Sequence, residues 1–258
     1  MNIVEHNSAA WDRYSENEIE WSVPVSSEEI ERARNGDWEI ILTPIKSVPR
    51  EWFGDVRGKD VLCLASGGGQ QVPILAAAGA RVTSFDASAK QLEKDRFVAE
   101  RDNLEIKTEK GDAADLSRLA DSSFDLIFHP CSNSFMAELE PIWRECFRVL
   151  RRGGALLAGF NNPIVYVFDT EAEEKEGVLK FRHKLPYSDE KDLTESEKSE
   201  KIGKNEPFEF SHSLDAQIGG QTGAGFLIAG FYEDWWTDEA RLLNKYTPTF
   251  MATRAIKP

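Results

Sequence analysis

Cysteine and long apolar runs are both scarce in this sequence. Its 258 residues include only three cysteines, Cys63, Cys131 and Cys146, which lie far apart and form no C-x-x-C pair. This pattern argues against a disulfide framework and a metal site, and it favours reduced thiols in a cytoplasmic protein. No apolar run approaches the roughly 20 residues of a membrane span, and the N-terminus lacks the basic start and apolar core of a signal peptide. We therefore expect a cytoplasmic protein with no membrane partner.

Positive charge is also scarce relative to negative charge. The 31 lysines and arginines stand against 45 aspartates and glutamates, which gives a formal net charge of −14. A surface of this sign repels phosphate backbones, and this argues against a nucleic-acid partner. The length and the 41% share of hydrophobic residues suit one α/β domain with a sizeable core.

Residues 59–71, KDVLCLASGGGQQ, predict a strand, a turn and a helix in immediate succession. Residues 61–64 are an apolar run typical of a buried parallel strand. The glycines at 67–69 allow a tight bend, and a helix-like stretch, 70–78, follows. The start of such a helix offers unpaired N–H groups to an anionic ligand. A tight turn that binds nothing explains a glycine triplet equally well, so the next strand is needed to decide.

That next strand is predicted at 81–85, and Asp86 follows it. An acidic residue at this place, about 20 residues beyond the glycines, can accept hydrogen bonds from both hydroxyls of a ribose. A dinucleotide fold would need a third glycine where Val72 stands. A ribose-containing ligand is therefore expected, and a NAD-type oxidoreductase is the weaker alternative.

The glycine turn resembles motif I of the class I S-adenosylmethionine-dependent methyltransferases, whose usual form is V-L-D-L-G-x-G-x-G. The residues that agree with this form are Val61, Leu62, Leu64, Gly67 and Gly69. Cys63 stands where an acidic residue is usual, and Ala65 where the first glycine is usual. These departures keep a second alternative open, a non-catalytic protein that binds S-adenosylmethionine.

Three further stretches follow motif I in the order of the same family. Residues 111–116, GDAADL, resemble its third motif, residues 123–127, SFDLI, its fourth, and residues 147–157, FRVLRRGGALL, the stretch after it. In the third motif the aspartate typically accepts from the adenine amino group, which here would be Asp112. The alternative is that Asp112 caps the short helix expected at 116–119.

The resemblance implies an α/β fold, a Rossmann-like three-layer sandwich with a mostly parallel seven-stranded sheet whose last strand is antiparallel. It implies the cofactor S-adenosyl-L-methionine, the product S-adenosyl-L-homocysteine and methyl transfer to a small-molecule acceptor. The expected cofactor-binding residues are Ala65, Ser66, Gly67, Gly68, Gly69, Asp86, Ala87, Ser88, Gln91, Asp112, Ala113, Ala114, His129 and Ser134.

His129 is the one weak catalytic candidate, because a histidine can take a proton near neutral pH. We favour a role in lining the cofactor without proton transfer. A sulfonium is already a strong electrophile, so methyl transfer can depend mainly on proximity and alignment.

The chain outside the motifs suggests how one methyltransferase domain, 1–258, is organised. We expect an N-terminal helical cap at 1–58, with an apolar helix face at 40–45, and a cofactor-binding core at 59–160. Residues 161–212 read as an inserted, substrate-side β element, and 213–258 as a C-terminal helix and strands.

Within the inserted segment, alternating residues at 178–188 and 208–212 predict two strands joined by a polar, loosely packed excursion. The proposed acceptor-binding aromatics are Trp11, Tyr14, Trp21, Phe181 and Phe208. The sequence predicts no oligomeric state.

Overall fold

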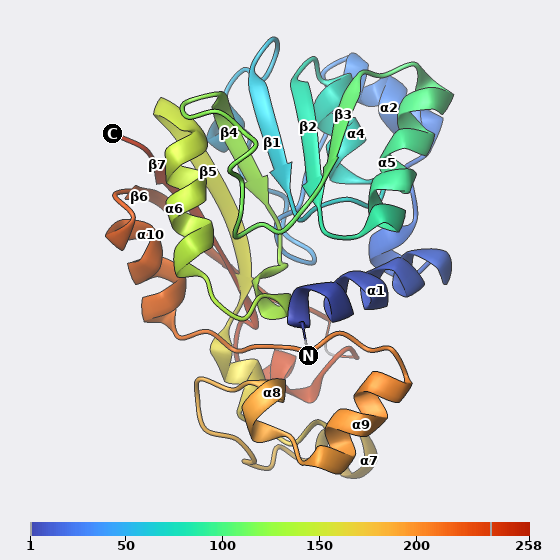
Figure 1. Ribbon diagram of the computed structural model, residues 1–258, viewed down its shortest axis with the longest axis vertical. Coiled ribbons are helices and arrows are strands. Elements are labelled where there is room, and N and C mark those ends of the chain that lie inside the picture. The colour runs from blue at the N-terminus through green and yellow to red at the C-terminus, as the bar shows by residue number, and fades with distance from the viewer. Residues whose placement is uncertain (1, 238) are drawn as a thin grey trace.

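The computed structural model describes residues 2–237 and 239–258, and a seven-stranded sheet runs through it (Figure 1). Its strands are β1 Asp60–Leu64, β2 Arg81–Asp86, β3 Ile106–Lys110, β4 Phe124–His129, β5 Leu150–Asn161, β6 Leu227–Asp234 and β7 Phe250–Ile256. They lie in the order β3-β2-β1-β4-β5-β7-β6. The first five strands are parallel, whereas β7 pairs antiparallel with both β5 and β6. The predicted fold class, with its antiparallel last strand, is confirmed.

Alternate residues of the strands serve two separate cores, as expected for a sheet that is covered on both faces. Val61 and Cys63 of β1 pack with α4 (Gln71–Ala77) and the N-terminal segment. Leu62 and Leu64 pack on the other face with α6 (Glu140–Val149). This is the three-layer arrangement of an α/β sandwich. A third long helix, α5 Ala89–Asp102, covers β2 and β3 (Figure 1).

The N-terminal residues form a cap of short elements. They are α1 Ile3–Glu16, η1 Glu20–Ser22, α2 Ser27–Arg34 and α3 Arg50–Phe53. Helix α2 begins with a capping box, in which Ser26 and Glu29 bond each other's backbone N–H groups. Helix α1 lies across the carboxyl edge of the sheet (Figure 1).

The helix face expected at 40–45 is wrong. This stretch is extended and makes only an isolated bridge between Ile41 and Ser47. Ile40 and Leu42 are buried while Ile41 between them is partly exposed, which is the two-residue period of an extended chain. Pro44, which lacks a backbone N–H, opposes helix formation at this point.

The β element expected at 161–212 is also wrong. The segment holds three helices, α7 Thr170–Glu176, α8 Asp189–Asp192 and α9 Glu195–Gly203, and its strand-like contacts are the isolated bridges Phe168–Phe181 and Ser188–Phe210. The polar excursion forms α9 because Thr194 and Glu197 make a capping box at its start. The segment lies beyond the carboxyl edge of the sheet, on the far side of α1 (Figure 1).

The remaining elements are η2 Asn133–Phe135, η3 Pro163–Tyr166, η4 Asp215–Gly219, α10 Gly220–Gly223 and η5 Leu242–Lys245. Within the described residues, none of the helices combines the length and the apolar character that crossing a bilayer requires.

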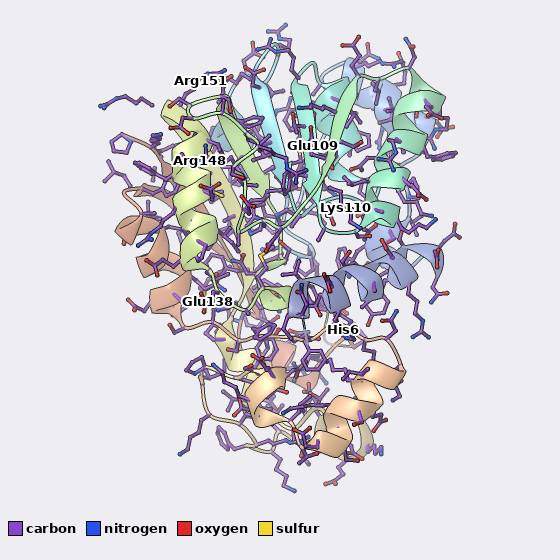
Figure 2. The ribbon with its side chains drawn as sticks, in the orientation of Figure 1. His6, Glu109, Lys110, Glu138, Arg148 and Arg151 are labelled. Atoms are coloured by element: carbon purple, nitrogen blue, oxygen red, sulfur yellow. The ribbon has the colours of Figure 1, made fainter. Side chains whose placement is uncertain are left out.

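Two arginines, at the end of α6 and the start of β5, bind carboxylates on the side of the sheet away from the cavity. Arg151 pairs with Asp125 at 2.8 Å and with Asp60 at 2.9 Å, and Arg148 pairs with Glu145 at 2.7 Å. Both arginines lie far from His6, toward the opposite edge of the sheet (Figure 2). They are therefore structural residues, far from the carboxyl edge where ligands of such sheets bind.

Candidate functional site

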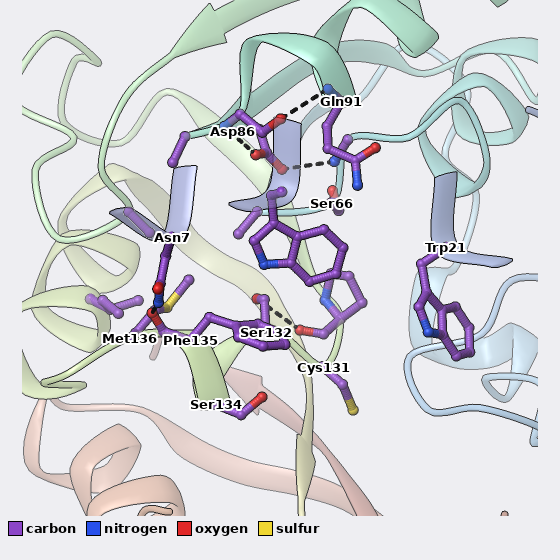
Figure 3. A pocket seen from close by; sticks show the side chains of 18 of the residues that line it. Asn7, Trp21, Ser66, Asp86, Gln91, Cys131, Ser132, Ser134, Phe135 and Met136 are labelled. Carbon is purple, nitrogen blue, oxygen red and sulfur yellow. Dashed lines mark hydrogen bonds between the residues drawn. The ribbon is translucent and has the colours of Figure 1, made fainter. Parts of the chain in front are cut away.

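A cavity of about 660 Å³ opens at the carboxyl edge of the sheet, beneath α1. It runs across the ends of the strands, from Asp112 after β3 to Asn161 and Phe250 on β5 and β7. Asp86, Ser66 and Gln91 lie toward one side of it and Cys131, Ser132 and Ser134 toward the other (Figure 3). The strand order thus separates a β2–β3 end from a β5–β7 end.

Most of the expected cofactor-binding residues line this cavity. They are Ala65, Ser66, Gly67, Asp86, Ala87, Ser88, Gln91, Asp112, Ala113, Ala114 and Ser134. Gly68, Gly69 and His129 are not part of the lining.

The glycines of the turn are required by neighbouring parts of the chain. A Cβ on Gly68 would lie 2.6 Å from the carbonyl oxygen of Trp21, and a Cβ on Gly69 would lie 3.0 Å from Pro24. Both glycines have positive φ angles, 132° and 76°. They let residues 21–24 pack directly on the turn, and of the three glycines Gly67 alone lines the cavity.

Ala65 stands at the motif position where glycine is usual, and its backbone shows why. Its φ is 48°, in the left-handed region, and its N–H donates to the carbonyl of Phe85 at 2.7 Å. A non-glycine residue in this conformation costs about 1–2 kcal/mol. Alanine, with the smallest side chain after glycine, keeps the turn and places Ser66 and Gly67 at the cavity.

Asp86 is fixed at the end of β2 by two backbone donors. Its Oδ2 accepts from the Gly67 N–H at 3.0 Å, and its Oδ1 accepts from the Ser88 N–H at 2.8 Å. Burial raises the pKa of Asp86 to about 6, and the two N–H donors oppose this shift. A carboxylate retains free lone pairs beyond two such bonds, so Asp86 can still accept from a diol.

Asp112 lies in a turn that contributes to the cavity lining. The short helix expected at 116–119 does not form, so Asp112 is not a helix cap; the stretch after β3 consists of turns. The Asp112 Oδ1 accepts from the Ala114 N–H at 3.0 Å, and Asp112, Ala113 and Ala114 all line the cavity.

Two buried polar atoms at the cavity lack partners. Ser66 Oγ and Gln91 Oε1 form no hydrogen bond within residues 2–237 and 239–258. Both residues line the cavity, but these two atoms are themselves buried and offer no exposed acceptor to a ligand. Asp86, whose carboxylate keeps free lone pairs, is the group here that fits the ribose end of the expected cofactor.

A buried carboxylate that the sequence analysis missed supports the glycine turn from below. Asp95 of α5 accepts from the Gly69 N–H at 2.8 Å and from Ser84 Oγ at 2.6 Å, and it is fully buried. Burial raises its pKa to about 7. The charge of Asp95 is close enough to Cys63 to raise the pKa of that thiol further, although burial is the main cause. The one feature of the sequence that could have pointed to Asp95 is its position four residues after Gln91, about one helical turn away.

His129 is placed differently from the expectation. Its side chain is completely buried, with Nδ1 3.0 Å from the carbonyl oxygen of Leu64 and Nε2 2.7 Å from the side-chain amide of Asn133. Burial lowers the pKa of His129, and both ring nitrogens are engaged inside the protein. It therefore has neither the access nor a free nitrogen for proton transfer.

Of the five aromatic residues proposed to bind the acceptor, two line the cavity and three do not. Trp11 and Trp21 line the cavity. Tyr14 packs edge-on against Trp11 outside the lining, and Phe208 is fully buried against His6. Phe181 is 78% exposed and packs on Phe168, because the strand that would have turned it inward does not form.

The β5–β7 end of the cavity is built from residues that carry no motif. They include Thr43, Pro44, Phe135, Asn161, Glu209, Trp236 and Phe250. They come from six separate segments, so only their meeting in space identifies them. Glu209 is a titratable group at this end of the cavity, and burial raises its pKa.

Comparison with known proteins places these features in context. Residues 62–158 match the family model described as a methyltransferase domain. A protein of Bacillus subtilis (strain 168), named the uncharacterized methyltransferase YbaJ, is 51% identical over 255 residues, 99% of this chain and 98% of that protein.

Two solved structures are similar in fold. An S-adenosylmethionine-dependent methyltransferase from Mesorhizobium loti superposes with a TM-score of 0.60 at 19% identity, covering 80% of this chain and 94% of that chain. A putative S-adenosylmethionine-dependent methyltransferase from Listeria monocytogenes gives a TM-score of 0.59 at 16% identity, covering 81% and 95%.

Proposed function

Because the chain belongs to the class I S-adenosylmethionine-dependent methyltransferases, we propose that it methylates a small molecule held at the β5–β7 end of its cavity. The observation that carries this proposal is the enclosure of one continuous cavity beneath α1. Its volume, about 660 Å³, is within the range of small-ligand sites.

Helix α1 is tied down on both sides of the cavity, which restricts access to it. Ser8 Oγ donates to the carbonyl of Ala87 at 2.7 Å beside β2, and Asn7 bonds the backbone of Phe208 in the inserted segment. A macromolecular acceptor would have to displace these contacts. The net charge of −14 also opposes a nucleic-acid acceptor.

We propose the following placement of the cofactor. Asp86 accepts from the ribose hydroxyls, Asp112 and Ala113 hold the adenine, and Ser66 and Gly67 meet the methionine end. When bound, S-adenosylmethionine supplies an electrophilic methyl group. The chain's own contribution is then to align the acceptor and exclude water, which residues 161–212 assist by closing the acceptor end.

The test is the size class of the methylated product. Purified protein is incubated with methyl-labelled S-adenosylmethionine and a cell extract, and the label is counted separately in filtrate and in precipitated protein and nucleic acid. We expect label in the filtrate with wild type and much less with Asp86→Ala. Label confined to the precipitate would contradict the small-molecule proposal. Cofactor binding without transfer to either fraction would favour the non-catalytic alternative.

A further inference from the structure

The charged residues that line the cavity are all acidic. They are Asp86, Asp112, Glu138 and Glu209, and no described lysine, arginine or histidine joins them. Three of these carboxylates lie toward the cofactor or on the α6 side, whereas Glu209 comes from the inserted segment. An acceptor with a negative charge would therefore meet like charge with no cation to offset it.

Glu209 is held in a short stretch that spans the acceptor end of the cavity. On one side of it, the Phe208 backbone bonds the Asn7 side chain in both directions. On the other side, the Phe210 N–H donates to the carbonyl of Ser134 at 2.7 Å. The Glu209 N–H itself donates to Asp189 Oδ2 at 2.7 Å. The position of this carboxyl group is thus set by three separate elements.

One carboxyl oxygen of Glu209 is engaged and the other is not. Oε2 accepts from the Tyr166 hydroxyl at 3.0 Å, and that hydroxyl also meets Asn161 Nδ2 at 3.4 Å. Oε1 receives no hydrogen bond across the part of the chain that the structure describes. Because Asn161 ends β5 and lines the same cavity, the bond through Tyr166 ties Glu209 to the β5–β7 end.

The groups around Glu209 compensate its charge only in part. Lys201 of α9 pairs with Asp189 at 2.8 Å, and Arg241 pairs with Glu173 at 2.6 Å, so both nearby cations are committed to other carboxylates. Burial and Asp189 raise the pKa of Glu209, while Lys201 and Arg241 lower it. Burial raises the pKa values of Tyr14, Tyr166 and Tyr187, and the charge of Glu209 adds to each shift.

From this arrangement we propose that Glu209 selects an amine as the methyl acceptor and binds its N–H through Oε1. The inference rests on the proposed function and names the class of acceptor. The ligand it describes is a small molecule with an apolar frame, suited to Phe135, Trp236 and Phe250, and one protonatable nitrogen.

The same carboxylate can prepare the amine for reaction. The ammonium group gives one proton to Oε1 of Glu209, and this leaves a lone pair on nitrogen. That lone pair forms the bond to the methyl carbon while the carbon–sulfur bond breaks and its electron pair stays on sulfur. A carboxyl group with a raised pKa is better matched to an amine than an ordinary glutamate is.

The test compares three probes on one frame: phenethylamine, 2-phenylethanol and phenylacetate. Their binding to the protein saturated with S-adenosylhomocysteine is measured by calorimetry at pH 7. We expect the amine to bind about tenfold more tightly than the other two, as for one charge-assisted hydrogen bond. Glu209→Gln should reduce this preference to about twofold or less, the size left without that bond.

Two variants serve as controls. Glu206→Gln removes the same charge three residues away, outside the cavity lining, and should keep the preference. Glu209→Asp keeps a carboxylate on a shorter side chain and should retain the preference with weaker binding. If the melting curve of Glu209→Gln shows that this variant does not fold, Glu209→Asp still tests the proposal.

The outcomes separate the inference from the proposed function. If S-adenosylhomocysteine does not bind, the proposed function fails and this inference fails with it. If it binds but the amine is not preferred, or the preference is unchanged in Glu209→Gln, the inference alone is overturned.

Discussion

The side chain of Asn7 forms hydrogen bonds in both directions with the backbone of Phe208, 201 residues away. Its Nδ2 donates to the Phe208 carbonyl at 3.0 Å, and its Oδ1 accepts from the Phe208 N–H at 2.8 Å. Nδ2 also donates to the carbonyl of Phe135 at 2.8 Å. One buried amide therefore joins α1, the inserted segment and the loop after β4 around the acceptor end of the cavity.

We predict that Asn7→Ala loosens this junction. Each buried backbone group left without its partner costs about 1–3 kcal/mol, so the local opening free energy of residues 206–212 should fall by about 2–4 kcal/mol. Amide hydrogen exchange of the Phe208 N–H measures this directly. Ser8→Ala, which loses a single bond to Ala87, is the matched control. Unchanged exchange at Phe208 in Asn7→Ala would show that the junction adds little.

Binding of S-adenosylhomocysteine should depend on pH through Asp86. The ribose hydroxyls require an ionised acceptor, and the pKa of Asp86 in the free protein is raised to about 6. Affinity should therefore be highest above pH 7 and fall by up to about tenfold per pH unit below pH 6. Calorimetric titrations from pH 5 to 8 measure the profile. Asp86→Asn should bind weakly with a much flatter profile, and a flat wild-type profile would refute the role given to Asp86.

The buried carboxyl group of Asp95 should make stability fall as the pH rises. Its pKa is about 7 in the folded protein, against the ordinary aspartate value of 3.8. Between these values the folded state holds a proton that the unfolded chain has lost, so rising pH favours unfolding. Relative to Asp95→Asn, wild type should lose about 4 kcal/mol of unfolding free energy from pH 4 to pH 8.

Chemical denaturation at several pH values measures this difference. Glu93→Gln, an exposed acid on the same helix, is the control and should show no such trend. A constant difference between wild type and Asp95→Asn across this range would mean that Asp95 titrates normally.

His129 should prove structural. Replacing it by leucine leaves the Leu64 carbonyl and the Asn133 amide without their partner, which should lower the unfolding free energy by about 2–4 kcal/mol. His129→Asn should retain S-adenosylhomocysteine affinity within about threefold, because His129 does not line the cavity. A change of that size is under 1 kcal/mol. Loss of S-adenosylhomocysteine binding in a folded His129→Asn protein would instead restore His129 to the site.

The cofactor end of the site could be predicted because its residues follow strand ends in sequence. Asp86 ends β2 and Asp112 lies two residues after β3, and parallel strands bring their carboxyl ends to one edge of the sheet. Local sequence therefore indicated where they would lie.

The acceptor end could not be predicted in the same way. Asn7 and Glu209 reach the same cavity only through tertiary packing, and neither lies in a motif. The alternation at 178–188 was misleading, because a two-residue period specifies a strand only where a neighbouring strand is available to pair with it. Phe181 consequently faces outward, and Phe208 packs beside the cavity instead of lining it.

The most direct test of the account is calorimetric titration of wild type and Asp86→Ala with S-adenosylhomocysteine, with NAD as the comparison ligand. We predict micromolar binding of S-adenosylhomocysteine. Asp86→Ala should weaken this binding at least about tenfold, which is the size expected for the loss of hydrogen bonds to a charged group. We also predict no binding of NAD. Absence of S-adenosylhomocysteine binding, or equal binding by a folded Asp86→Ala protein, would contradict the assignment of this cavity.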